Sequence, residues 1–206
     1  MSPEGTSKYS ESYNDESANI TLTSSDDVLF KVNSYEMKTH SSVLRDILSD
    51  PNLKSSTIPI DPDSSVLILF LDNMTKYPPP LVSSWKMAES LFSLADKYDC
   101  RIVHETLKFR LGHVTMIAPW EVFCFASHEN DLDLARKALE KMGQDFRRNE
   151  MTLTDMSAKD ILEPTAPYLV GLLDQLGTNR TVTRNTRSHR NDVNWEIMAK
   201  YFTPRL

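Results

Sequence analysis

The 206-residue chain has few glycines and cysteines, and this scarcity excludes several kinds of site. Five unclustered glycines leave no loop that could cradle a phosphate with successive backbone amides. Cys100 and Cys124 form no CxxC pair and lie in apolar stretches, so we expect both to be small core residues of a reduced protein. No HExxH, Cys/His zinc spacing or GxSxG elbow occurs. The sequence therefore predicts no catalytic residue, no metal and no cofactor, in a protein that is not an enzyme.

An excess of positive charge and long apolar runs are also missing. The chain has 23 Lys and Arg against 29 Asp and Glu, a net charge of −6, whereas binding to nucleic-acid phosphates requires excess cations. No apolar run approaches the roughly 20 residues that cross a bilayer, and the first residues lack the apolar stretch of a secretory signal. We therefore expect an intracellular protein, cytoplasmic or nuclear, that binds neither nucleic acid directly nor membranes.

The N-terminal part predicts a polar tail followed by a β-hairpin. Residues 1–18 are rich in Ser, Glu and Asn, so we expect them to be disordered. From Asn19 onward, apolar residues alternate with polar ones at Ile20, Leu22, Val28, Phe30 and Val32. The turn-favouring residues 24–27 separate the two runs, which is typical of a hairpin. Residues 57–60 predict a third short strand with a proline at its edge.

The remainder of the chain is dominated by helical periodicity. Apolar residues recur at three- and four-residue intervals on either side of Asp99-Cys100, at Ala88, Leu91, Phe92, Ala95, Tyr98, Val103, Leu107 and Leu111. This spacing predicts two amphipathic helices with a break between them. Helices also follow Pro119 and Asp131, and Ser157 and Asp160 predict a capping box. A pair of helices that follows a hairpin in the sequence and carries no cluster of reactive side chains favours partner binding over catalysis.

Four short sequence segments, in the same order along the chain, resemble those of a known family. They are the segment SVLRDIL at 42–48, IPI at 58–60, the prolines at 78–80 and LADKY at 94–98. In order and spacing they resemble the BTB/POZ domain, most closely that of fungal BTB proteins. The resemblance implies an α+β fold, with a short three-stranded sheet flanked by a cluster of helices and an all-helical C-terminal extension. It places a BTB domain at 19–112, the helical extension at 113–176, and a polar linker with a short C-terminal helix at 177–206.

The same resemblance implies a function and candidate contact residues. BTB proteins are non-catalytic protein–protein interaction modules, and some are substrate adaptors for cullin-type ubiquitin ligases. Met87-Ala88-Glu89 matches the hydrophobic-x-acidic triplet of those adaptors, in which the apolar side chain fills a groove on the cullin scaffold. Tyr77 and Pro79 lie in a proline-rich loop that is a second candidate contact. The implied partners are a cullin and a recruited substrate protein.

Several alternatives remain open from the sequence. Met87 can instead be part of the core, Glu89 a solvated helix charge, and the proline loop a plain spacer. The alternative function is a BTB-type transcriptional or chromatin-associated scaffold that acts through recruited partners, because no DNA-binding unit is encoded. Family members that form strand-swapped homodimers carry an apolar helix and strand before the first core strand. Residues 1–18 show neither pattern, so we expect no strand-swapped homodimer.

Overall fold

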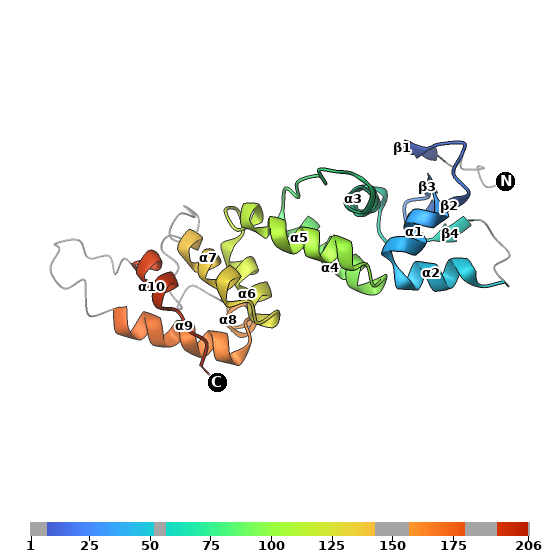
Figure 1. The fold of residues 1–206 in the computed structure, drawn as a ribbon. Coiled ribbons are helices and arrows are strands. Elements are labelled where there is room, and N and C mark those ends of the chain that lie inside the picture. The colour runs from blue at the N-terminus through green and yellow to red at the C-terminus, as the bar shows by residue number, and fades with distance from the viewer. Residues whose placement is uncertain (1–7, 52–56, 143–156, 180–192, 206) are drawn as a thin grey trace. The chain divides into compact units, whose positions relative to one another are not determined.

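The computed structural model describes residues 8–51, 57–142, 157–179 and 193–205. The protein is of the α+β class, with a small sheet near the N-terminus and helices through the rest of the described chain (Figure 1). It divides into two compact units, residues 1–109 and 110–206. None of the helices in the described ranges has the length and apolar character needed to span a membrane.

The sheet of the first unit has four strands in the order β1-β3-β2-β4. These are β1 (Lys8–Asn14), β2 (Ile20–Thr23), β3 (Val28–Val32) and β4 (Thr57–Pro59). The predicted hairpin is confirmed, because β2 and β3 pair in antiparallel register. Its turn includes Asp27 at φ 60°, a left-handed conformation that Asp tolerates better than most residues. β4 pairs in parallel with β2, and β1 pairs in parallel with β3.

β1 overturns two predictions. The sheet has four strands rather than three, and residues 8–14, predicted to be disordered, form its edge strand. The cause is non-local: β1 pairs with the free side of β3 in an irregular register, and Tyr13 packs on Phe30 with ring centroids 6.0 Å apart. The expectation of no strand-swapped homodimer rests on the lack of an apolar helix and strand before residue 19; β1 is a strand but a polar one, so that expectation stays a prediction.

The same unit contains the helices α1 (Ser34–His40), α2 (Ser42–Ser49), α3 (Ser64–Thr75) and α4 (Trp85–Lys97). Leu22 lies in register with Phe30 on one side and Ile58 on the other, so three buried side chains adjoin on one face of the sheet. The helices contribute the rest of this core, chiefly Met37, Leu44, Leu67, Phe70, Leu71 and Leu91. Burial of these side chains is the main force that holds the unit together.

The predicted break between two helices is confirmed. α4 ends at Lys97, Asp99 adopts φ 45°, and α5 (Arg101–Val114) begins two residues later. Ser41 holds this junction from α2: its hydroxyl accepts from the Leu44 amide at 3.0 Å and donates to the carbonyl of Tyr98. A fully buried N-cap thus joins two helices that are distant in sequence.

The second unit contains α6 (Pro119–His128), α7 (Leu132–Met142), α8 (Ala158–Leu162), α9 (Ala166–Asn179) and α10 (Trp195–Tyr201). The capping box predicted at Ser157 and Asp160 is confirmed. Residues 177–179, predicted to begin a polar linker, extend α9, while residues 180–192 lie outside the described part of the chain. The C-terminal residues pack tightly, with Phe202 fully buried against Phe123 and Tyr168.

Candidate functional site

The four residues singled out from the sequence lie in one segment, which leaves α3 and enters α4. Tyr77 is 97% exposed and Leu81, which the sequence argument missed, is 62% exposed. Pro79 and Met87 are half-buried, and Glu89 is exposed. We call these five residues the α3–α4 segment. Single exposed apolar side chains are common on protein surfaces and occur elsewhere here, as at Phe109, which is 90% exposed; what distinguishes this segment is that two of them lie four residues apart in one short connection.

The start of α4 is fixed by an ordinary helix cap. The hydroxyl of Ser84 accepts a hydrogen bond from the amide of Met87 at 3.3 Å. The buried side of α4 is formed by Ala88, Leu91, Phe92, Leu94 and Ala95. Met87 and Glu89 flank the buried Ala88, so Met87 is partly covered while Glu89 faces solvent. The sequence left open whether Met87 is a core residue or a contact residue. Its half-buried side chain is compatible with both, because one part is covered and the other is exposed to solvent.

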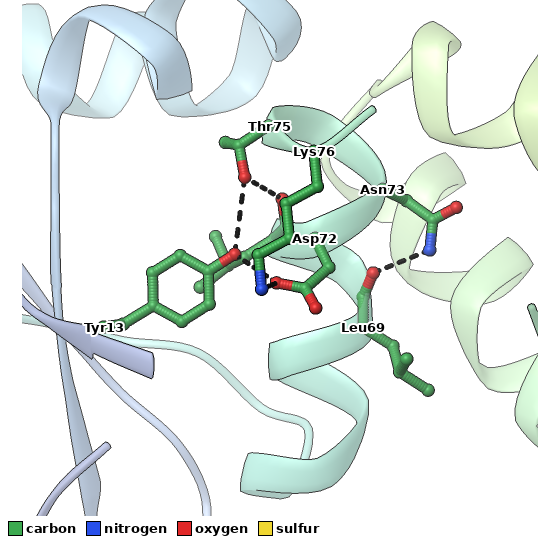
Figure 2. A network of polar contacts seen from close by, with 7 residues as sticks. Tyr13, Leu69, Asp72, Asn73, Thr75 and Lys76 are labelled. Atoms are coloured by element: carbon green, nitrogen blue, oxygen red, sulfur yellow. Dashed lines mark hydrogen bonds and ion pairs between the residues drawn. The ribbon is translucent and has the colours of Figure 1, made fainter. Parts of the chain in front are cut away.

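A polar network fixes the end of α3, from which the segment starts (Figure 2). The hydroxyl of Tyr13 on β1 donates to Asp72 Oδ1 at 2.6 Å, and Lys76 Nζ lies 2.8 Å from the same oxygen. Lys76 is also the C-cap of α3, since its amide donates to the carbonyl of Asp72 at 2.9 Å. Figure 2 shows Asn73 on the other side of the helix, where it donates to the carbonyl of Leu69 at 2.7 Å.

This network is partly shielded from water. Asp72 is only 8% exposed. Its buried carboxylate accepts a hydrogen bond from Tyr13 and forms an ion pair with Lys76. Burial, followed by the hydrogen bond to Asp72, raises the pKa of Tyr13 far above its ordinary 10.0. Tyr13 therefore stays a neutral donor throughout the physiological range. Residue 77 follows directly after Lys76, so β1 fixes the position from which the exposed connection departs.

The far end of α4 is held by contacts within the same unit. Lys97 forms an ion pair with Asp61, and Ser42 bonds to Asp99 just after the helix. His104 stacks edge-on against Phe92, with ring centroids 5.2 Å apart, in α5. Contacts therefore hold α4 at both of its ends, so the α3–α4 segment is attached to a helix whose position is fixed.

Sequence reasoning missed Tyr13 and the network that it completes. The pattern KYSESYN offers only two aromatic residues in a polar stretch, and Ser10 rather than an apolar residue is buried on β1. The available signal was the pair Tyr9 and Tyr13, the two large aromatic groups of an otherwise polar segment. The partner of Tyr13 lies 59 residues away, beyond the reach of any local periodicity.

The described residues also contain a polar cavity of about 240 Å³ between β1, β3 and α1. It is lined by Lys31, Asp15, Glu36 and Asn33 among others, a mixture of both charge signs. Within the described ranges, no three His, Cys, Asp or Glu side chains gather as metal ligands would. Burial raises the pKa of the Cys100 thiol to about 11, so that at neutral pH it is protonated and a weak nucleophile.

Comparison with known proteins adds no family assignment. No protein-family model matches the chain, and no curated protein is significantly similar to it.

Proposed function

We propose that the chain is a non-catalytic protein–protein interaction module of the BTB type, and that the α3–α4 segment contacts its partner. The observation that carries the proposal is the exposure of Tyr77 and Leu81 in a connection whose two ends are held. Exposed aromatic and aliphatic side chains on a fixed base lose little conformational entropy on binding. The order of hairpin, paired helices, short strand and further helices agrees with the arrangement that the resemblance implies.

The partner that best fits is the cullin scaffold of a ubiquitin ligase, to which the chain would deliver a substrate protein. The half-buried Met87 supplies an apolar anchor of limited mobility, because its helix is capped by Ser84. The exposed carboxylate of Glu89, two residues on, gives a polar contact at the rim. An anchor with a charged neighbour is a common design of small interfaces, in which few residues supply most of the affinity.

Binding of the purified chain to purified cullin N-terminal domains tests the adaptor role. We expect Met87→Asp and Glu89→Lys each to weaken binding at least tenfold, because they place a charge on the anchor or reverse the rim charge. Ser93→Asp is the matched control, since it adds a charge at an exposed position on the same helix. Circular dichroism establishes that all three variants remain folded. Absence of cullin binding by the unaltered chain would refute the adaptor role.

The broader claim, that this segment contacts partners of any kind, has its own test. The tagged chain of residues 1–206 is purified from cells beside a Tyr77→Ser, Met87→Asp double variant, and the captured proteins are identified by mass spectrometry. We expect proteins that bind the unaltered chain to be lost from the double variant. If every partner is retained, the α3–α4 segment is not the contact surface.

A further inference from the structure

The C-terminal residues of the second unit lie on their own helices as a bound peptide would. After α10, residues 202–205, which we call the tail, form neither helix nor strand, and Phe202 has extended backbone angles. The side chain of Phe202 is fully buried, with its ring 5.5 Å from that of Phe123 and 5.7 Å from that of Tyr168. One aromatic side chain enclosed by two others is the kind of anchor that dominates small interfaces.

The backbone of the tail is held by groups that would recognise any sequence. Arg136 of α7 donates two hydrogen bonds to the carbonyl of Phe202, from Nε at 3.2 Å and from Nη2 at 3.0 Å. The amide of Arg205 donates to the carbonyl of Pro167 at 2.9 Å. These bonds hold the main chain of the tail at Phe202 and at Arg205 and do not depend on the side chains between them.

Gly171 of α9 allows this close approach. A Cβ built there would lie 2.3 Å from the carbonyl oxygen of Thr203 and 3.2 Å from the Cα of Pro204. Both are backbone atoms that cannot move aside like a flexible side chain. One turn further along α9, Asp174 forms an ion pair with Arg205 at 2.8 Å. Gly171 therefore admits the peptide backbone at residues 203 and 204, and Asp174 pairs with an arginine at the position that follows.

We propose that Phe123, Arg136, Pro167, Tyr168, Gly171 and Asp174 form a peptide-binding site, which we call the tail site. In this structure the tail of the same chain occupies it. In trans it binds a peptide in which an aromatic residue is followed, three positions later, by an arginine. The proposal concerns the second unit alone and does not depend on the α3–α4 segment or on the BTB resemblance.

Local release of the tail is compatible with its contacts. Thr203 and Arg205 are exposed, and the side chains of the Arg205–Asp174 pair are 66% and 47% exposed, so water and salt screen that pair. Phe202 is thus the main side-chain anchor, beside the two bonds from Arg136. Segments held by so few groups open locally while the rest of a domain stays folded, which leaves the tail site accessible to a competing peptide.

A fluorescently labelled peptide corresponding to residues 201–206, added to the protein of residues 1–206, tests the proposal. The double variant Phe202→Ala, Arg205→Glu removes both side-chain anchors of the tail and leaves the tail site unchanged. We expect this variant to bind the peptide at least tenfold more tightly than the unaltered chain, in which the tail competes. A peptide carrying the same two substitutions should not bind, and adding Gly171→Ala to the variant should weaken binding at least tenfold.

Equal binding to the unaltered chain and the variant, or binding insensitive to Gly171→Ala, would refute the tail site. If the double variant does not fold, hydrogen exchange in the unaltered chain decides the question. Millimolar peptide should then raise exchange at the Arg205 amide at least twofold, since the peptide displaces the tail from Pro167. Unchanged exchange in that experiment refutes the proposal as well.

Discussion

The hydroxyl of Tyr13 donates a hydrogen bond to the carboxylate of Asp72 at 2.6 Å, across 59 residues of sequence. This bond ties the edge strand β1 to the end of α3. Lys76 approaches the same oxygen of Asp72, and its ammonium lies 5.7 Å from the centroid of the Tyr13 ring. Three side chains thus connect the N-terminal strand to the helix end that precedes Tyr77.

Removal of the Tyr13 hydroxyl should destabilise the first unit. In Tyr13→Phe the ring remains against Phe30, but the nearly buried Asp72 loses a hydrogen-bond donor. We expect the free energy of unfolding in urea to fall by about 1–3 kcal/mol. Tyr9→Phe is the matched control, because Tyr9 lies on the same strand and is 41% exposed. Equal losses in the two variants would show that Asp72 does not depend on Tyr13.

Two serine caps should differ in their contribution to stability. Ser41 is fully buried and bonds both to the Leu44 amide and to the carbonyl of Tyr98, whereas Ser84 is exposed and caps only its own helix. We expect Ser41→Ala to lower the free energy of unfolding by about 2–3 kcal/mol, since it also leaves a buried carbonyl without that donor. Ser84→Ala should cost about 1 kcal/mol. Urea titrations of the two variants give the comparison, and equal costs would contradict it.

Helical glycines should respond to alanine with opposite signs. Gly112 in α5 has open space where a Cβ would lie, so Gly112→Ala should stabilise the protein by about 0.5–1 kcal/mol through helix propensity. Gly171→Ala places a methyl group against the backbone of Thr203 and should destabilise the protein by about 1–3 kcal/mol. Thermal and urea unfolding measure both effects. A stabilising Gly171→Ala would mean that the tail does not lie on α9.

Stability should decline in alkaline solution in part because of Cys100. Burial raises the pKa of this thiol from the ordinary 9.0 to about 11, so the folded protein keeps the proton more tightly than the unfolded chain. The stabilising contribution is complete below pH 9 and is lost as the pH rises toward 11, by at most about 1.4 kcal/mol per pH unit. In Cys100→Ala this contribution to the fall of the free energy of unfolding with pH should vanish, although the variant is less stable than the unaltered chain below pH 9.

The alkaline measurement requires urea titrations between pH 8 and pH 11 under reducing conditions. Burial also raises the pKa values of Tyr13 and Tyr98, and their ionisation adds to the decline above pH 10. Both tyrosines are present in the unaltered chain and in Cys100→Ala, so the difference between the two curves isolates the thiol. Parallel curves between pH 9 and pH 11 would contradict the prediction.

Local patterns predicted those elements whose stabilising contacts are close in sequence. The β2–β3 hairpin follows from alternation around a turn, and the break at Asp99 follows from two helical stripes separated by a polar residue. The helix starts at Pro119 and Ser157 were recognisable because capping chemistry lies within one turn. The exposure of Tyr77 agrees with its place beside three prolines, which exclude a continuing helix.

Elements that depend on distant partners could not be predicted in this way. β1 exists because β3 offers it an unpaired edge and Asp72 a hydrogen-bond acceptor, neither of which the polar sequence around Tyr13 encodes. The place of Phe202 in the aromatic cluster was equally hidden, since it depends on residues of α6 and α9. Leu81 was missed because a single leucine after prolines has no periodicity to interpret.

The position of β1 at the outer side of β3 also bears on how shortened forms of this protein will behave. A polypeptide that starts at Asn19 would expose a row of backbone amides and carbonyls along β3, and such an edge recruits strands from neighbouring molecules. Fragments that begin at Asn19 should therefore self-associate more in light-scattering measurements than fragments that begin ahead of Lys8, in which the polar, irregularly paired β1 covers the edge of β3.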